Sequence, residues 1–577
     1  MFIVARDLGV IAKQGIRGTI LTYAGTVVGA VTTLFVVAHF LTAEDYGLAQ
    51  LLIDMAVMLS TLMQLGTGSA LIRFWPWFSA ESTETAEARE EGAAGDTKGT
   101  EGAGDTGKAE RAGDTEGAGD NGKRGAGAHG FLFWAMAVPL AGFVLIGAVY
   151  ALLRPWLADY FGQRSALFVH YYWYVLPLAA GMLYQTVAET CSTVQMRIVF
   201  PKGVREVGVR LGMMGVYLAY GLGGLDTDGM VGAICGVYGA AAIVNICYLI
   251  FSSNRNGRNA SGGATETKRN ASGGATETKR SAASMFRPDF GFLRANRRLT
   301  VEAVHYMAFV TLSALVSVLA PYLSSFIISA RQGLDWNGIF KMAFFMSAMV
   351  SIPSRSLTGI ASPELSAAMS RGDQRHTARL TQQVARNLWI AGWLITAAIW
   401  LNIDLIFHIL PNGSVYEAGR ETVLLLSLSQ LLLSTFSITL VTLTYSRHYR
   451  LTLVFSLLLT LLTLVLGNLL IPRYGITGAA TANLLAYCVY YSCLLVAVRL
   501  STGTVPFSRS MLLILAEKAA VFGMNAILSR LLATMNVWLS ALLRDALLLL
   551  PACLTALRLS PEMTELWKKT RDRRKSG

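Results

Sequence analysis

Three ionisable side chains inside long apolar segments are the residues most able to do chemistry in this chain. Asp54, Glu189 and Lys341 each interrupt a run of apolar residues that could cross a membrane. Charges are costly within a bilayer and usually serve transport or ion coupling there. We expect Asp54 and Glu189 to bind a coupled proton or sodium ion, because both lie on polar stripes of their helices. A structural alternative stays open, in which each carboxylate bonds to a neighbouring hydroxyl or an interfacial cation.

Cations near predicted helix ends form a second candidate group. Arginine binds phosphate oxygens in pairs through its planar fork, so these residues could hold an anionic diphosphate. The candidates for this role are Arg73, Arg197, Arg205, Arg210, Lys341 and Arg355. Cations also collect at cytoplasmic helix ends for topological reasons, and a lysine can extend outward to the interface. A purely positional explanation therefore stays open for each of them.

Motifs for catalysis or for nucleotide hydrolysis do not occur in the sequence. The seven His and six Cys residues lack metal-ligand spacing, and there is no phosphate-cradling Gly-rich loop. We therefore expect a protein that is not an enzyme and has no cofactor. Its energy would come from an ion gradient, from the membrane potential or from removal of the product.

Apolar helices must position these residues, because 53% of the chain is hydrophobic and only 15% is charged. A bilayer core about 30 Å thick needs about 20 apolar residues per helix. The sequence predicts an all-α polytopic membrane protein with fourteen spans, at 19–41, 47–72, 130–153, 171–193, 205–223, 229–251, 303–329, 338–360, 387–410, 421–444, 451–471, 475–498, 511–531 and 536–557. Charged pairs interrupt the last two spans, so twelve spans stay an alternative.

Polar stripes along several spans predict a wet cavity between them. In the second span Gln50, Asp54 and Gln64 stand at offsets 0, 4 and 14, which is one face of a helix. Lipid would disfavour such a face, so it should point inward. The candidate lining residues are Thr22, Thr26, Gln50, Gln64, Tyr174, Gln185, Tyr306, Ser313 and Ser317. Hydroxyls bonded to their own helix backbone would explain any single stripe, whereas stripes in both halves of the chain favour a shared cavity.

The distribution of Lys and Arg predicts the orientation of the chain in the membrane. With a cytoplasmic N-terminus, six cations fall in the outer gaps and 40 on the cytoplasmic side, so both termini are expected in the cytoplasm. No cleavable signal peptide is expected, because charges interrupt the first seventeen residues. The net charge of +13 comes from inner loops and the tail. Anionic membrane lipids are its expected partners, and no nucleic acid is required.

Two polar low-complexity inserts divide the chain into regions. The second insert contains RNASGGATETK twice without a mismatch, at 258–279, and neither insert has the large apolar side chains that ordering requires. The predicted regions are an N-terminal lobe at 1–251 with a disordered cytoplasmic insert at 79–129, a cytoplasmic linker at 252–298, a C-terminal lobe at 299–500, and two more helices with a basic tail at 501–577. Similar Gly-x-x-Gly-Ala turns at 229–233 and 475–479 indicate a parallel internal repeat of two six-helix lobes.

Four segments carry a resemblance to a known superfamily: FLTAEDYGLAQLL at 40–52, GTGSALIRFWP at 66–76, SPELSAAMSRGD at 362–373 and IPRYGITGAATA at 471–482. In order and helix position they resemble the multidrug/oligosaccharidyl-lipid/polysaccharide exporter superfamily, and within it the polysaccharide transporter or O-antigen flippase branch. The resemblance implies two lobes around a central cavity that opens alternately, in a bacterial plasma membrane. It also implies a polyprenyl-diphosphate-linked oligosaccharide as cargo, flipped from the inner to the outer leaflet. Glycan polymerases or glycosyltransferases are the implied protein partners.

Other functions stay open at this point. An ion-coupled drug or cation antiporter of the same superfamily would favour a compact carboxylate site in one lobe, but the first span lacks the acidic residue seen in many of those exporters. A peptidoglycan-precursor flippase fits fourteen spans, whereas the first span lacks the intramembrane arginine that this family uses for its anion site. A polymerase or ligase of the same pathway would be expected to have a large outer loop, and no outer gap exceeds about twenty residues.

Overall fold

The computed structural model of the chain describes residues 18, 20–73, 127–195, 197–262, 297–446, 448–503, 509–532 and 535–551. Within these ranges the regular structure is entirely helical, with no strand. Nine helices in this part of the chain are long and apolar enough to cross a membrane. The prediction of an all-α polytopic membrane protein is therefore confirmed.

The helices up to Gly262 form what we call the N-terminal group. Its long members are the helical segment Ile20–Phe40, α3 (Ala43–Met63), α5 (Gly127–Leu152), α8 (Val175–Val194) and α11 (Thr227–Gly262). A further long member is a continuous run of three elements: α9 (Val199–Gly203), a π-helical turn (Val204–Gly208) and α10 (Val209–Gly221). The segment Ile20–Phe40 ends in a π-helical turn (Thr32–Val37) and α2 (Ala38–Phe40). Short connectors are α6 (Arg154–Gly162), α7 (Ala166–His170) and a 3-10 turn (Tyr172–Tyr174).

The helices after Arg297 form the C-terminal group. They are α13 (Arg297–Arg331), α14 (Leu334–Ala348) continuing through a 3-10 turn (Met349–Ser351) into α15 (Ile352–Ser370), α16 (Gln374–Leu401), α17 (Ile403–Ile409), α18 (Gly413–Tyr416) with a 3-10 turn (Glu417–Gly419), α19 (Arg420–Thr435), α20 (Ser437–Tyr445), α21 (Leu451–Thr502), α22 (Arg509–Leu531), α23 (Val537–Arg544) and a π-helical turn (Asp545–Leu549). Each of the fourteen predicted spans coincides with helix in the described residues.

Helix extends into the ends of both predicted polar inserts. Helix α11 continues to Gly262, eleven residues past the predicted end of its span at 251. Helix α5 begins at Gly127, inside the insert predicted at 79–129. The rest of that insert, most of the predicted linker at 252–298 and the tail from 552 lie outside the described residues.

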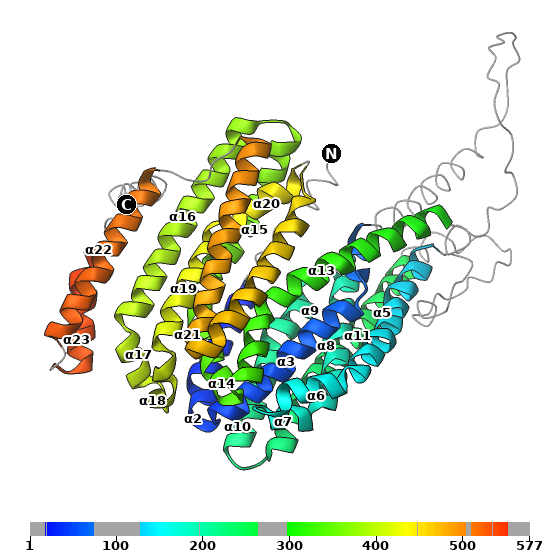
Figure 1. Ribbon diagram of the computed structural model, residues 1–577. Helices are drawn as coiled ribbons and strands as arrows, with labels where there is room; N and C mark the ends of the chain where they lie inside the picture. Colours follow the sequence, from blue (N-terminus) through cyan, green and yellow to red (C-terminus); the bar gives the residue numbers. More distant parts are fainter. Residues whose placement is uncertain are drawn as a thin grey trace, which may run out of the picture.

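The two groups lie side by side, with α13 and α14 between the bulk of each (Figure 1). We call the end at which the segment Ile20–Phe40 begins the proximal end, and the end that carries α2, α7 and α18 the distal end. Helix α3 packs against α5 and α8 of its own group and against α13 and α14 of the other group. It is therefore the main element through which the two groups meet.

Close contact between α3 and α14 at the distal end depends on two glycines. A Cβ atom at Gly47 would lie 1.8 Å from the carbonyl oxygen of Leu334, and one at Gly338 would lie 1.9 Å from that of Ala43. The side chain of Asn337 donates a hydrogen bond to the carbonyl oxygen of Gly47 at 3.1 Å. The two backbones therefore touch, as small residues allow in membrane helix pairs.

The last two helices bury the two cations, Lys518 and Arg544, that made their spans doubtful in the sequence. The side chain of Lys518 on α22 is only 1% exposed, and Trp389 of α16 donates a hydrogen bond to the carbonyl oxygen of Met511 at 3.2 Å. Arg544 of α23 is buried and forms an ion pair with Asp404 at 3.1 Å. These charges therefore face protein, which explains why hydropathy alone left the two spans uncertain.

Helix α21 combines two predicted spans that join at a kink. Gly475 has φ +58° and ψ −137°, a conformation that other residues rarely adopt. Replacing Gly475 with Ala is expected to destabilise the protein by about 1–3 kcal/mol through backbone strain. Thermal unfolding in detergent measures this effect. Gly523→Ala is the matched control, because Gly523 lies inside α22 with open space at its Cβ position and Ala favours a helix. Equal stability of the two variants would contradict the strain argument.

Candidate functional site

A buried ion pair joins the two groups in the distal half of the bundle. Asp54 projects from the middle of α3, and its carboxylate contacts the ammonium group of Lys341 on α14. The two side chains are 6% and 10% exposed. The ammonium nitrogen of Lys341 also lies 5.9 Å from the ring centroids of Tyr322 and Phe344. Two residues that the sequence placed in separate roles, ion coupling and diphosphate binding, are therefore partners of each other.

Hydrogen bonds beside this pair continue the contact towards the distal end. Ser325 of α13 donates to the side-chain oxygen of Asn337 on α14 at 2.7 Å, and Asn337 in turn bonds to the backbone of α3. A buried ion pair adds little net stability, but breaking one is costly, because the remaining charge is left without a partner in a low-dielectric environment. The pair therefore joins α3 to α14 through a contact that is costly to break.

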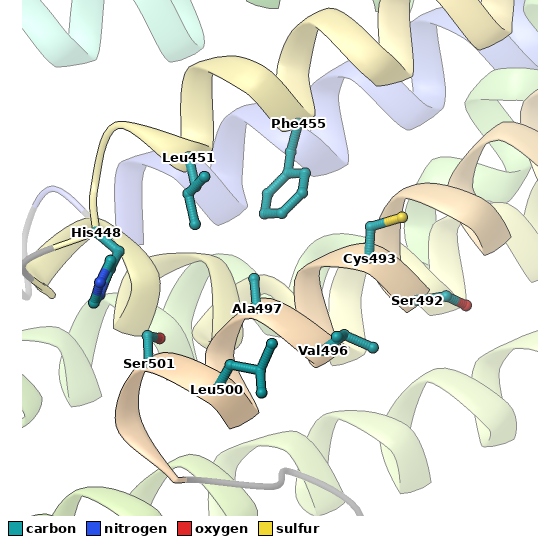
Figure 2. Close-up of a pocket in the computed structure, with 9 residues that line it drawn as sticks. All are labelled: His448, Leu451, Phe455, Ser492, Cys493, Val496, Ala497, Leu500 and Ser501. Atoms are coloured by element: carbon teal, nitrogen blue, oxygen red, sulfur yellow. The ribbon is translucent and has the colours of Figure 1, made fainter.

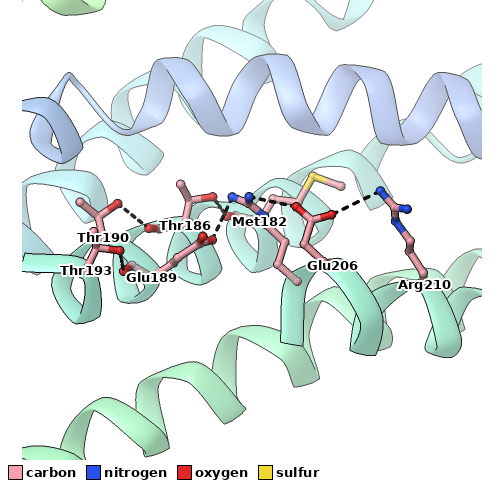
Figure 3. A network of polar contacts seen from close by, with 8 residues as sticks. Met182, Thr186, Glu189, Thr190, Thr193, Glu206 and Arg210 are labelled. Atoms are coloured by element: carbon pink, nitrogen blue, oxygen red, sulfur yellow. Dashed lines mark hydrogen bonds and ion pairs between the residues drawn. The ribbon is translucent and has the colours of Figure 1, made fainter. Parts of the chain in front are cut away.

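A second polar network lies near the proximal end of the N-terminal group (Figure 3). Arg205 forms an ion pair with Glu189 of α8 at 2.9 Å and one with Glu206 at 3.2 Å. The other carboxylate oxygen of Glu206 pairs with Arg210 at 3.4 Å. The carboxylates are mostly buried, at 13% and 14% exposed, whereas the side chain of Arg205 is 44% exposed. The network therefore presents guanidinium groups towards the accessible side.

The C-terminal group supplies another cation to the same region. Arg210 lies against the segment Ile20–Phe40, with a guanidinium nitrogen 3.3 Å from the Cβ position of Gly29. On the same segment the hydroxyl of Tyr23 is hydrogen-bonded at 2.5 Å to Ser356 of α15. The neighbouring Arg355 is exposed and lies within electrostatic range of Arg210. Arg210 of the N-terminal group and Arg355 of the C-terminal group therefore lie near each other beside this segment.

We define the basic cluster as Lys202, Arg205, Arg210 and Arg355. Lys202 belongs to it because its ammonium nitrogen lies 3.5 Å from the Cβ position of Gly18, at the start of the same segment. Against these four cations stand the two carboxylates of Glu189 and Glu206. The cluster therefore has an excess of positive charge, which suits the binding of an anion with several oxygens.

The other predicted diphosphate ligands are Arg73, Arg197 and Lys341, and none of them is a member of the basic cluster as defined above. Arg73 is exposed at the proximal end, where it lies 3.8 Å from Glu302 and 4.5 Å from the ring centroid of Tyr306. Arg197 is half-buried just before α9. Lys341 is in the buried pair with Asp54 described above. The structure thus brings together Arg205, Arg210 and Arg355 and gives Arg73 and Lys341 other partners.

Three of the predicted cavity-lining hydroxyls bond to their own helices. Thr22, Thr26 and Ser313 each donate to the carbonyl oxygen four residues earlier, at 3.0, 2.8 and 3.0 Å. This is the local bonding that the sequence left open as an alternative. It satisfies the hydroxyls wherever the helix faces, so the lining role of these residues stays a prediction.

The remaining lining candidates differ in their surroundings. Gln50, Gln64 and Tyr306 are half-buried, and Tyr174 is 38% exposed at the distal end of α8. Gln185 is 3% exposed, and its amide nitrogen lacks a hydrogen-bond partner among the described residues. The side chain of Ser317 lies outside the part of the chain that the structure describes.

Sequence reasoning missed two residues that complete these sites. Glu206 bridges Arg205 and Arg210, and its spacing of four residues from Arg210 is a helix-pair signal that could have revealed it. Asn337 bonds across the two groups, and nothing in its local sequence marks it. Among the described residues no group of His, Cys, Asp and Glu could hold a metal ion.

An apolar groove opens on the C-terminal group, between the two halves of α21 (Figure 2). It has a volume of about 540 Å³. Its lining residues are His448, Leu451, Phe455, Ser492, Cys493, Val496, Ala497, Leu500 and Ser501. Because these residues stand near the start and the end of α21, the groove lies at the proximal end.

Comparison with protein-family models and with curated proteins found no match. Among solved structures, one described as lipid II flippase MurJ in an inward closed conformation matches with a TM-score of 0.63 and 11% identity, over 94% of this chain and 99% of that chain. The fold of this chain is similar to that of MurJ. The match to MurJ extends over nearly all of both groups, although at this identity it shows the fold alone.

Two further solved structures are MATE transporters, one of them described as a multidrug resistance transporter. An inward-facing MATE transporter of the MOP superfamily matches with a TM-score of 0.49 and 13% identity, over 84% of this chain and 98% of that chain. A mutant of the Vibrio cholerae MATE transporter VcmN matches with the same score and identity, over 87% and 99%. The three structures are thus described as one flippase and two transporters, one of which is assigned to the MOP superfamily.

Proposed function

We propose that this chain is a flippase that moves a lipid-diphosphate-linked oligosaccharide from the inner to the outer leaflet of a bacterial plasma membrane by alternating access. The observation that carries the proposal is the basic cluster, because both groups of helices contribute cations to it. The charge distribution of the sequence favours a cytoplasmic position for the proximal end. The cluster would then face the side on which such a lipid is made.

The charge balance of the cluster suits a diphosphate. Four cations face two carboxylates, so an excess positive charge is available to a diphosphate diester, which is a dianion. Arginine guanidinium groups can donate hydrogen bonds to several phosphate oxygens at once. Since Arg210 and Arg355 come from different groups, a bound diphosphate would draw the proximal ends of the two groups together.

Competition between carboxylates and phosphate offers a route to proton coupling. Glu189 and Glu206 already occupy the guanidinium group of Arg205. A phosphate that binds this guanidinium group in place of a carboxylate leaves that mostly buried carboxylate without its cation. The carboxylate then binds a proton more readily. A sodium ion is less suited to this position, because the adjacent guanidinium groups repel it. We therefore propose H⁺ as the coupled ion and Glu189 as its binding residue.

The buried pair of Asp54 and Lys341 would act as the distal closure in this cycle. Opening the distal end requires α3 and α14 to separate, and these two side chains lie between them. A proton on Asp54 would weaken the attraction and lower the cost of separation. The two sequence-predicted ion-coupling residues would thus work at opposite ends of the same conformational change.

The function is tested by leaflet transfer of a labelled lipid-linked oligosaccharide in vesicles that contain the purified protein. Arg205→Gln and Arg210→Gln are each expected to slow transfer about tenfold or more, since each removes a charge-assisted hydrogen bond to phosphate. Arg473→Gln, on the distal side and exposed, is the control and should have little effect. Equal transfer with and without the protein would reject the flippase proposal.

Glu189→Gln separates binding from coupling. The variant keeps a hydrogen-bonding side chain but frees the charge of Arg205, so transfer is expected to lose its dependence on a pH gradient while the protein still binds the diphosphate. The measurement compares transfer rates with and without an imposed pH gradient. Glu302→Gln is the matched control, because Glu302 pairs with Arg73, which is not a member of the basic cluster. A gradient dependence that survives in Glu189→Gln contradicts the assigned role.

A peptidoglycan-precursor flippase is the second candidate. It is favoured by the similarity to the structure described as lipid II flippase MurJ, which covers 94% of this chain. The same vesicle assay distinguishes the two when lipid II and an O-antigen-type oligosaccharide on the same lipid carrier are compared. Faster transfer of lipid II would favour the second candidate over the first.

A further inference from the structure

We propose that the groove between the two halves of α21 binds one acyl chain of an anionic phospholipid from the proximal leaflet. This site is separate from the basic cluster and does not depend on the transported substrate. Three features support such a site: the shape of the groove, the charge at its mouth and the absence of any carboxylate in the surrounding sequence.

The shape follows from small side chains on one half of the helix. On the half that follows the kink, Cys493 and Ala497 line the groove, whereas Leu451 and Phe455 line it from the other half (Figure 2). The two halves touch at the distal kink, where a Cβ atom at Gly478 would lie 2.3 Å from the carbonyl oxygen of Leu470. They leave a volume of about 540 Å³ at the proximal end, which is within the range of ligand sites in proteins, ~300–1,000 Å³.

The mouth of the groove is positively charged. His448 lines it directly, Arg450 immediately precedes Leu451, and Arg499 immediately precedes Leu500; all three are exposed. The sequence contains no Asp or Glu between residues 422 and 516. Neither α20 nor α21 therefore supplies a carboxylate that could balance the cations at this end of α21. An amphiphile with an apolar chain and an anionic headgroup matches both parts of the site.

Charge should decide which lipid occupies the groove. An acyl chain gains little from leaving the bilayer for the groove, because both surroundings are apolar. Cations near an anionic headgroup, in contrast, favour it by about fivefold each. The site is therefore expected to select lipids by headgroup charge. Other lipid positions around a membrane protein are expected to select by headgroup charge to a much smaller degree.

Photochemical labelling tests the proposal on the full-length protein in proteoliposomes. The probe is phosphatidylglycerol with a diazirine on one acyl chain, compared with phosphatidylcholine that carries the same group. We expect phosphatidylglycerol to label peptides containing Phe455 or Val496 at least about fivefold more than phosphatidylcholine. Ala497→Phe fills the groove and should abolish this labelling. Val489→Phe is the matched control on the same helix, since Val489 is 43% exposed and does not line the groove, and should leave labelling unchanged.

A second variant keeps the test decisive if Ala497→Phe does not fold. Arg499→Gln leaves the groove open and is expected to reduce the preference for phosphatidylglycerol about fivefold. Equal labelling by the two lipids, or equal labelling of Ala497→Phe and the unmodified protein, overturns the proposal. Displacement of the probe by a polyprenyl phosphate but not by unlabelled phosphatidylglycerol would also overturn it, because the occupant would then be the tail of a lipid carrier. Leaflet transfer is measured separately, so failure here leaves the proposed function standing.

Discussion

Replacing Lys341 with Met is expected to lower the free energy of unfolding by about 3–5 kcal/mol, because it leaves the Asp54 carboxylate buried without its cation. Both side chains are at most 10% exposed, so water cannot replace the lost partner. Thermal unfolding of the detergent-solubilised protein measures the change. Arg473→Gln is the control, since it removes an exposed cation and should leave the midpoint unchanged.

The double variant Asp54→Leu, Lys341→Met distinguishes a buried pair from two independent residues. Replacing both charges with apolar groups is expected to recover most of the lost stability, as it does for buried pairs in general. The double variant should nevertheless transport poorly, because nothing then releases the distal closure in response to a proton. Stability losses that simply add in the double variant would contradict the assignment of Asp54 and Lys341 as a pair.

Gly47→Ala is expected to have the second large effect, a forced separation of α3 and α14. The added Cβ would lie 1.8 Å from a backbone oxygen of α14, which cannot move without moving the helix. Overpacking of this kind costs about 1–3 kcal/mol and here acts on one end of the bundle only. The closed distal state should therefore lose population relative to a state in which the two groups part at this end.

Spin-label distances across the distal end measure this shift. A label on each of α3 and α14 should report a longer or broader distance distribution in Gly47→Ala than in the unmodified protein. Gly232→Ala is the matched control, because Gly232 lies in α11 with no atom within 4 Å of its Cβ position. Unchanged distances in Gly47→Ala would show that the two helices are not held as closely as the structure indicates.

The helices could be predicted from the sequence because their signal is local. Runs of about 20 apolar residues require nothing more than a bilayer as solvent. The signal for the break between the eleventh and twelfth spans is also local, since Gly475 takes a backbone conformation that favours glycine. The limits of the polar inserts were less certain, because helices such as α11 continue beyond the apolar part of the sequence to Gly262.

The partners within the sites could not be predicted, since they depend on how distant segments pack. Asp54 and Lys341 were both identified as buried charges, but nothing in either helix indicates that they meet. Glu189 and Arg205 were likewise assigned to different roles, and the structure places them 2.9 Å apart. In each case the sequence identified the costly residue, and tertiary contact decided its partner.

The most direct test of the account is leaflet transfer by a protein whose distal closure is locked. In a background without the native cysteines, Ala43→Cys on α3 and Leu334→Cys on α14 lie at the distal contact and leave Asp54 and Lys341 in place. They can be bridged by a short bifunctional methanethiosulfonate reagent and released by reduction. Alternating access predicts that bridging stops transfer of a lipid-linked oligosaccharide and that reduction restores it to the rate of the unbridged double variant. Transfer at the same rate in the bridged and the reduced protein would contradict the account.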